Sequence, residues 1–308
     1  MVIKKKKIGL ALGSGGARGL AHIGVIKALE EKNIPIDIIS GTSIGALVGG
    51  LYSAGIDVKT MEKIVSNVDK MMVAKIMVPK LFAAGFVDNK RVIEFIKNLV
   101  GDVKIENLKI PFACVATDLI TGEEVLFKKG SLVDAIMASN AIPTIFQPVF
   151  LNNRYLLDGG LCNPLPISIA KEMGANRIIA VNVSPNPKRI TQKIKTRKTK
   201  EVAKLIKKLS LIFVSFISDG KNVFSSKELL LKIDESIDSE LNSPTLMNVF
   251  LQSISISTNN LIIQHLRYAK PDLLISPEVE NYDMLEFYKG LEIIKCGYNA
   301  AHNETINI

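Results

Sequence analysis

Two short stretches of the chain carry a serine and an aspartate in positions suited to hydrolytic chemistry. In "GTSIG", residues 41–45, Ser43 lies between Gly41 and Gly45, after an apolar run and before a segment with helical spacing. A strand–turn–helix of this kind is too tight for side chains at the flanking positions, and it exposes the serine hydroxyl above the helix N-terminus. The pattern predicts that Ser43 is a nucleophile and that Gly41 and Gly45 form its turn.

The second stretch is "DGG", residues 158–160, at the end of a short apolar run. A carboxylate at a strand end, followed by glycines that let a backbone or a substrate come close, is placed like a catalytic acid or base. Taken alone, however, this stretch fits an ordinary turn aspartate better.

Histidine is the usual base for a serine, but the chain has only His22, His265 and His302. An ordinary α/β-hydrolase has its triad in the order Ser, acid, His, with several strands before the nucleophile. Here only one expected strand precedes the strand that leads into Ser43, His22 comes before Ser43, and the other two histidines lie in the C-terminal part. The sequence therefore favours an acid as the base, with His22 packed among apolar residues of the first helix.

A glycine-rich loop, "GSGGARG" at residues 13–19, precedes the first expected helix. Backbone N–H groups at a helix N-terminus favour a negative charge, either a bound phosphate or a transient oxyanion. Arg18 stands where a dinucleotide-binding fingerprint would have its third glycine, and no Lys followed by Ser or Thr ends the loop as in a P-loop. A transient oxyanion is therefore the better interpretation.

Together, "GSGGARG", "GTSIG" and "DGG", in this order, resemble the patatin-like phospholipases, specifically the bacterial branch related to neuropathy target esterase. The resemblance continues through "ASNAIPTIFQPV" (138–149) and covers roughly residues 6–185. This family uses a Ser–Asp dyad without histidine. The resemblance thus implies that Ser43 is the nucleophile and Asp158 the proton acceptor, and that neither a metal nor an organic cofactor is needed.

The glycine loop then becomes the candidate oxyanion hole. The donors would be the backbone amides of Gly15, Gly16 and Ala17. Ser14 stands where the family's GGGxRG motif commonly has its first glycine. We expect Arg18 to brace the loop, with contact to a lipid phosphate as the alternative. Pro143, Phe146 and Pro148 are candidates for the acyl pocket, although core packing explains each of them taken singly.

The expected activity is that of a serine esterase that releases fatty acids from phospholipids, lysophospholipids or related lipid esters. The alternative is a catalytically silent module that binds a membrane surface or regulates a partner through residues 188–208. This basic segment holds ten Lys or Arg and one Glu, which accounts for the whole formal net charge of +9. We expect it to contact an anionic membrane and not nucleic acid, although a solvated linker explains the same charge.

Alternation of apolar runs with helix-period segments predicts a three-layer α/β/α fold with a mainly parallel central sheet and a helical C-terminal extension. The expected strands are 8–12, 36–40, 111–117, 123–127, 154–157, 177–183 and 272–276. The expected helices are 18–32, 44–54, 58–67, 89–100, 131–139, 165–173, 198–217, 245–267 and 283–300. Residues 6–185 would form the catalytic domain, and residues 186–308 the basic linker plus a mainly helical part packed on it.

The apolar runs and the cysteines indicate in which cellular compartment the protein is expected. No stretch reaches the roughly 18 apolar residues of a membrane-spanning helix. The apolar run after the N-terminal lysines ends at the glycine loop, too early for a secretory signal. Cys114, Cys162 and Cys296 are scattered and match neither a disulfide framework nor a metal-ligand spacing. We therefore expect a cytoplasmic protein with peripheral contact at the inner membrane surface.

Overall fold

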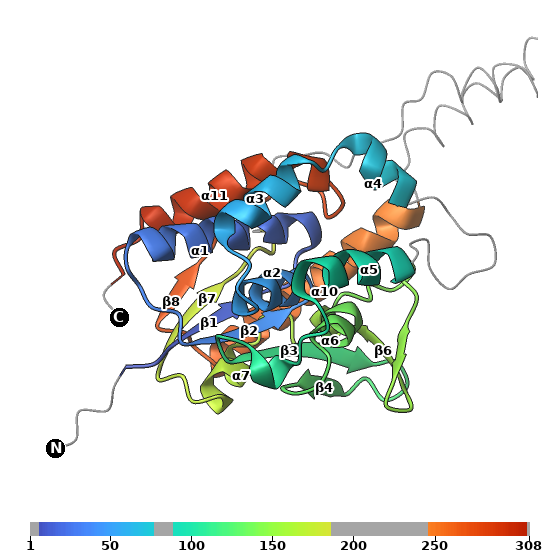
Figure 1. Cartoon of the computed structure of the whole chain (residues 1–308), viewed down its shortest axis with the longest axis horizontal. Coiled ribbons are helices and arrows are strands. Elements are labelled where there is room, and N and C mark those ends of the chain that lie inside the picture. Colours follow the sequence, from blue (N-terminus) through green and yellow to red (C-terminus); the bar gives the residue numbers. More distant parts are fainter. Residues whose placement is uncertain (1–5, 77–88, 186–245, 307–308) are drawn as a thin grey trace, which may run out of the picture. The chain divides into compact units, whose positions relative to one another are not determined.

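The computed structural model describes residues 6–76, 89–185 and 246–306 (Figure 1). The chain divides into two compact units, one formed by residues 1–190 and 254–308 and the other by residues 191–253. Of the second unit, only residues 246–253 are described, and they form the first turns of helix α10 (Leu246–Tyr268). The basic segment 188–208 and the helix expected over 198–217 lie outside the described residues. The proposed domain boundary at residues 185/186 stays a prediction.

The first unit is built on a mixed sheet of eight strands in the order β5-β6-β3-β2-β1-β7-β8, with β4 paired to β3. The strands are β1 (Ile8–Leu12), β2 (Ile38–Thr42), β3 (Phe112–Asp118), β4 (Glu124–Phe127), β5 (Val149–Leu151), β6 (Arg154–Asp158), β7 (Arg177–Val181) and β8 (Leu273–Ile275). Strands β3, β2, β1, β7 and β8 run parallel, and β4, β5 and β6 pair in antiparallel fashion. The predicted α/β class with a mainly parallel sheet is confirmed.

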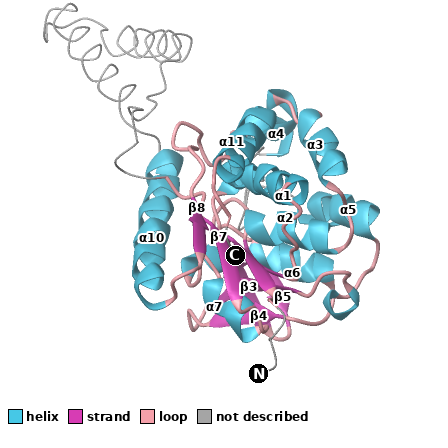
Figure 2. Cartoon of the chain, turned by 90° about the vertical axis from the view of Figure 1, so that its left-hand side faces the viewer, coloured by secondary structure: helices cyan, strands magenta, loops and turns pink. Residues whose placement is uncertain are grey.

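Consecutive residues of the central strands are apolar. Because alternate strand residues point to opposite sides, both faces of the sheet are apolar. Leu10 and Leu12 of β1 pack into the larger core, whereas Ala11 packs into a second core with Ile262 of α10. Figure 2 shows α7 and α10 on one side of the sheet and the remaining labelled helices on the other. The fold is therefore the predicted three-layer arrangement.

The helices agree with the expected ranges to within a few residues, with local differences. They are α1 (Ala21–Glu31), α2 (Ile44–Ser53), α3 (Val58–Ser66), α4 (Lys70–Ile76), α5 (Asn89–Val100), α6 (Leu132–Ser139), α7 (Ile167–Glu172), α10 and α11 (Gly290–His302). The helix expected from residue 18 begins as the 3₁₀ helix η1 (Gly16–Leu20), and the last helix begins seven residues later than expected. Neither α4 nor β5 was predicted.

The C-terminal helix α11 lies against α1, and two glycines allow the close contact. A Cβ atom on Gly24 of α1 would collide with the Ile294 carbonyl, and one on Gly297 of α11 would collide with the Ala21 carbonyl. This packing brings the segment before α11 to the glycine loop, where the Met284 carbonyl accepts a hydrogen bond from the Ala17 N–H. Residues 254–308 thus belong to the same structural unit as the candidate site.

Cys114, Cys162 and Cys296 are free thiols. Among the helices that the structure describes, none combines the length and the apolar character needed to cross a bilayer.

Candidate active site

Two strands that meet end to end on one edge of β3 bring Ser43 and Asp158 together. Thr42, the last residue of β2, pairs with Val115, and Asp158, the last residue of β6, pairs with Ala116. Val115 and Ala116 also pair with β4, which therefore occupies one edge of β3. Strands β2 and β6 must then share the other edge of β3. Since β2 is parallel and β6 antiparallel to β3, their C-terminal ends point at each other. The topology therefore joins residues that are 115 positions apart.

Ser43 lies on a tight turn between β2 and α2, in a backbone conformation that side chains rarely adopt. Its φ and ψ angles are 57° and −125°. A Cβ atom on Gly41 would meet the Gly45 carbonyl, and one on Gly45 would meet the Leu12 carbonyl, so only glycine fits at either position. The Ser43 N–H donates a 2.9 Å hydrogen bond to Ser139 Oγ at the end of α6. This contact helps to hold the strained conformation.

The Ser43 hydroxyl donates a 2.5 Å hydrogen bond to Asp158 Oδ2, and both side chains are buried. Asp158 Oδ1 accepts a 2.7 Å hydrogen bond from the Gly160 N–H. The Asp158 backbone is fixed as well, because its carbonyl accepts from Thr117 Oγ1 and its N–H donates to the Ala141 carbonyl. Burial raises the pKa of Asp158 to about 6, and the hydrogen bonds from Ser43 and Gly160 limit the rise. A carboxylate of this basicity is ionised at neutral pH and can accept a proton.

The glycine loop offers two backbone donors beside this pair. The Ser14 N–H donates to the Pro164 carbonyl and the Ala17 N–H to the Met284 carbonyl. For the N–H groups of Gly15 and Gly16, by contrast, the structure gives no acceptor among the described residues. Of the three expected oxyanion donors, Gly15 and Gly16 are thus available, whereas the Ala17 amide already has a partner.

Arg18 lies under the loop and binds it from within the protein. Its side chain is buried, and Nε donates a 3.3 Å hydrogen bond to the Gly15 carbonyl. Burial lowers the pKa of Arg18 to about 10, while the negative charges of Asp283 and Glu280 oppose the shift. The C=O and N–H of one peptide group point in opposite directions. The Gly15 carbonyl and the Gly16 N–H belong to one peptide group. Because the carbonyl points toward Arg18, the Gly16 N–H points away from Arg18.

The histidines lie away from this pair. His22 is fully buried, its Nε2 lies 2.7 Å from the Gly13 carbonyl, and burial lowers its pKa to about 4. His265 is on α10, and His302 stacks on Tyr298 at the end of α11. None of the three lines the cavity at Ser43.

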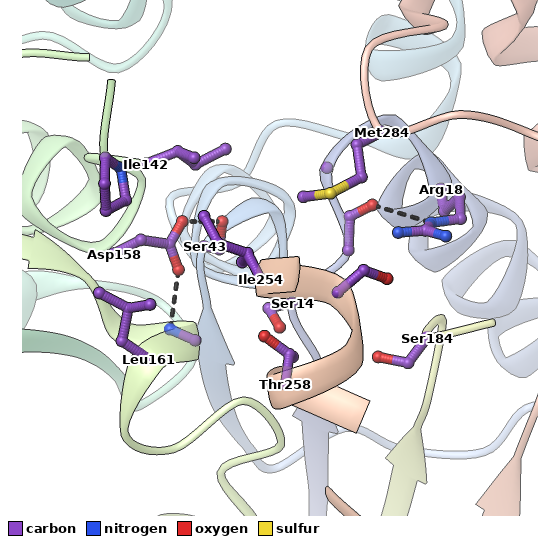
Figure 3. A pocket seen from close by; sticks show the side chains of 15 residues that line it. Ser14, Arg18, Ser43, Ile142, Asp158, Leu161, Ser184, Ile254, Thr258 and Met284 are labelled. Carbon is purple, nitrogen blue, oxygen red and sulfur yellow. Dashed lines mark hydrogen bonds between the residues drawn. The ribbon is translucent and has the colours of Figure 1, made fainter. Parts of the chain in front are cut away.

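A cavity of about 30 Å³ opens beside Ser43 and Asp158 (Figure 3). Ile142, Pro143 and Leu161 contribute its apolar side near Asp158, while Phe146 and Pro148 are not among its lining residues. Hydroxyl residues line it as well, from the glycine loop, α10 and the segment after β7. The hydroxyl residues there are Ser14, Ser184, Ser255 and Thr258. This volume holds one or two water-sized groups, so a fatty acyl chain requires the cavity to widen.

Several residues of the site carried no recognisable signal in the sequence. Ser139 lies within the stretch "ASNAIPTIFQPV", but nothing local marks its hydroxyl as the acceptor for Ser43. Met284 and Thr258 come from the C-terminal part and reach the site only through tertiary packing. Within the described ranges, no group of three or more His, Cys, Asp or Glu side chains could hold a metal ion.

A tight turn bearing a serine at the edge of a cavity, a basic buried carboxylate in contact with it and two nearby amides with no acceptor among the described residues can support nucleophilic acyl transfer. A three-layer α/β/α fold carrying such a turn falls in the broad class of α/β serine hydrolase folds. Residues 10–171 match the family described as "Patatin-like phospholipase". This match covers more than half of the chain, and the chain belongs to the patatin-like phospholipase family.

Individual relatives are similar over different lengths. An uncharacterized NTE family protein of Mycobacterium tuberculosis (strain ATCC 25618 / H37Rv) is 40% identical over 178 residues, which cover 58% of this chain and 49% of that protein. Lysophospholipase NTE1 of Candida glabrata is 28% identical over 303 residues, covering 96% of this chain and 16% of that protein. The chain thus spans about half the length of the mycobacterial relative and much less of the fungal one. The solved structure of VipD from Legionella pneumophila aligns with 96% of this chain and 66% of its own, with 14% identity and a TM-score of 0.47.

Proposed function

We propose that the chain is a serine hydrolase that releases fatty acids from lipid esters through a Ser43–Asp158 dyad. The observation that carries the proposal is the 2.5 Å hydrogen bond from Ser43 Oγ to Asp158 Oδ2 in a site that no histidine lines. The strained backbone conformation of Ser43 in the tight turn between β2 and α2 supports the same conclusion, as does membership in the patatin-like phospholipase family.

In the acylation half-reaction, Ser43 Oγ attacks the ester carbonyl carbon while its proton passes to Asp158. The carbonyl electron pair moves to the oxygen, which becomes an oxyanion and accepts hydrogen bonds from the Gly15 and Gly16 N–H groups. As the intermediate collapses, the bond to the alcohol oxygen breaks. Asp158 returns the proton to that oxygen, so the alcohol leaves neutral and the acyl group remains on Ser43.

Deacylation repeats these steps with water as the nucleophile. Water gives its proton to Asp158 as it attacks the acyl carbon, and a second tetrahedral oxyanion forms at the same position. Collapse breaks the bond to Ser43 Oγ, which takes back the proton from Asp158, and the fatty acid leaves. The mechanism needs one base of suitable pKa and two oriented donors, and it routes no step through a metal or an organic cofactor.

The substrate class follows from family membership and from a cavity lined by both apolar and hydroxyl-bearing residues. Phospholipids and lysophospholipids, or related lipid esters, combine an apolar acyl chain with a polar alcohol. The fungal relative is named a lysophospholipase, which supports this choice. We assign the acyl chain to the side of Ile142, Pro143 and Leu161. Binding then requires that the cavity widen along this side.

Residues 188–208 give the proposed enzyme a route to its substrate. Their local charge of +9 favours contact with an anionic membrane surface, where lipid esters are concentrated. We propose peripheral contact with such a surface through this segment. The rival function, a silent binding module, would need the same contact but no reactive serine.

The decisive test is covalent labelling with a fluorophosphonate, which reacts with an activated serine. We expect the wild type to be labelled at Ser43 and to hydrolyse members of a panel of phospholipids, lysophospholipids and short-chain esters. Ser43→Ala should do neither. Labelling of Ser43→Ala at a rate equal to that of the wild type, or equal hydrolysis by the two, would contradict the proposal.

A further inference from the structure

Ser14 carries a buried hydroxyl for which the described part of the chain provides no hydrogen-bond partner. The residue is 6% exposed, and its Oγ is fully shielded from solvent. Its backbone is fixed, because the N–H donates a 2.8 Å hydrogen bond to the Pro164 carbonyl. Burying an unpaired hydroxyl costs stability. The protein therefore retains a group that the fold alone does not use.

The hydroxyl lies in the catalytic cavity. Ser14 lines the cavity together with Ser43 and Asp158, and Figure 3 shows its side chain beside them. A Cβ atom placed on Gly160 would lie 3.1 Å from Ser14 Oγ and 3.0 Å from Asp158 Oδ1. Because glycine has no side chain, position 160 leaves a space that borders both Ser14 Oγ and Asp158 Oδ1. Ser14 also directly precedes Gly15 and Gly16, the two loop residues whose amides have no acceptor among the described residues.

We propose that the Ser14 hydroxyl is a third hydrogen-bond donor to the oxyanion of the tetrahedral intermediate, beside the Gly15 and Gly16 amides. This inference rests on the proposed function. The Ala17 amide cannot serve without breaking its bond to Met284, so the backbone supplies two donors. A hydroxyl on the same loop adds a donor from a side chain whose backbone is already held. This gives the residue that replaces the family's first loop glycine a catalytic role.

The chemistry predicts which rate constant depends on Ser14. Charge develops on the carbonyl oxygen only as Ser43 Oγ bonds to the acyl carbon, and a hydrogen bond to an anion is stronger than one to a neutral carbonyl. The Ser14 O–H can turn about its Cβ–Oγ bond to follow that oxygen. Its contribution therefore belongs mainly to the transition state, and its loss should slow acylation without weakening substrate binding.

Ser53 provides a matched control. Its hydroxyl is also buried and has no partner among the residues that the structure describes, but it lies at the end of α2 and does not line the cavity. Ser53→Ala and Ser14→Ala thus remove the same kind of group, and only Ser14→Ala removes it from the site. Both variants should melt no lower than the wild type, because each loses an unpaired buried hydroxyl.

The experiment measures acylation in the pre-steady state, using p-nitrophenyl butyrate and following p-nitrophenolate release. We expect Ser14→Ala to acylate about 100-fold more slowly than the wild type, with the apparent dissociation constant unchanged within twofold. The rate of Ser43 phosphonylation by a fluorophosphonate should fall as well. Ser53→Ala should match the wild type in every measurement.

Two outcomes would overturn the inference. Wild-type acylation by Ser14→Ala would show that the hydroxyl does not act on the oxyanion, and a change in the dissociation constant alone would mean contact with the ground state. Failure of the proposed function is distinguishable, because the wild type itself would then neither react with the fluorophosphonate nor hydrolyse the ester. In that event the role of Ser14 falls with it.

Discussion

Ser43 Oγ and Asp158 Oδ2 are 2.5 Å apart because β2 and β6 end against each other on the same edge of β3. The contact depends on backbone pairing and not on a flexible side chain that must swing into place. The carboxylate is also shielded from water, which strengthens its interaction with the serine proton. A base so placed needs no histidine between itself and the nucleophile.

The first prediction concerns this pair. Ser43→Ala and Asp158→Asn should each lower kcat for ester hydrolysis by about 10⁴-fold or more, because one removes the nucleophile and the other its base. The double variant should be no slower than the slower single variant, since the two groups act as a unit. Steady-state kinetics on p-nitrophenyl butyrate measures all three.

The control for the dyad uses the histidines that lie away from it. His265→Ala and His302→Ala should keep near-normal kcat, because neither residue lines the cavity. A loss of 100-fold or more in either variant, with circular dichroism like that of the wild type, would instead point to a triad.

The parts of the site that could be predicted from the sequence are those encoded by local patterns. Gly41, Ser43 and Gly45 lie within five residues, and their turn follows from sterics alone. The pairing of Ser43 with Asp158 depended on family resemblance, since nothing in the sequence shows that β6 turns back beside β3. Most of the sheet followed from apolar periodicity, although the three-residue strand β5 was missed.

The contacts of single atoms could not be predicted. The Ala17 amide was an expected oxyanion donor, yet the Met284 carbonyl from a segment far along the chain occupies it. Likewise, Ser139 reaches the Ser43 N–H only because α6 ends beside the tight turn that carries Ser43. Such hydrogen bonds depend on tertiary packing, which a sequence pattern does not encode.

The second prediction tests the orientation of the glycine loop. Arg18→Lys keeps a positive charge but loses the Nε–H that binds the Gly15 carbonyl, so the Gly16 N–H is no longer held toward the oxyanion. We expect kcat/KM to fall about tenfold or more on both a neutral short-chain ester and a phospholipid. A fall on the phospholipid alone would favour the other interpretation, in which Arg18 contacts a lipid phosphate.

A third prediction concerns the acceptor for the nucleophile's own N–H. Ser139→Ala leaves the Ser43 N–H buried without its acceptor, which should lower the free energy of unfolding by about 1–3 kcal/mol. The strained turn also loses a restraint, and kcat should fall about tenfold. Urea unfolding and steady-state kinetics measure the two effects.

Ser131→Ala is the matched control, because Ser131 caps the other end of the same helix by accepting from the Asp134 N–H. Its loss should cost about 1 kcal/mol of stability and leave kcat unchanged. Equal kcat values for the two variants would show that the Ser139 hydroxyl does not position the nucleophile.

The fourth prediction addresses the basic segment. Replacing Lys193, Lys195, Arg197, Lys198 and Lys200 with glutamine removes five of its charges, each contributing about 1 kcal/mol near an anionic bilayer. The wild type should co-sediment with anionic but not neutral vesicles, less so as salt rises, and the variant should bind more weakly. Both should hydrolyse a soluble short-chain ester equally. Unchanged sedimentation of the variant would make the segment a solvated linker.

The fifth prediction is a pH dependence of both rate and stability that Asp158 controls. Because the pKa of Asp158 is about 6, kcat/KM should rise through pH 6 as the base ionises and level off above pH 7. His22 should not contribute to this rise, since burial lowers its pKa to about 4. An activity profile that keeps rising to pH 9 would indicate a different base.

Stability should change with pH in the opposite sense. In the unfolded chain Asp158 has an ordinary pKa of 3.8, so between about pH 4 and pH 6 the folded state binds more protons than the unfolded state. The free energy of unfolding therefore falls as pH rises through this window, and above it the buried charge costs about 3 kcal/mol. Asp158→Asn removes this cost. Urea unfolding at pH 8 should find the inactive variant more stable than the wild type, with the difference shrinking toward pH 4, whereas a difference independent of pH would contradict the raised pKa.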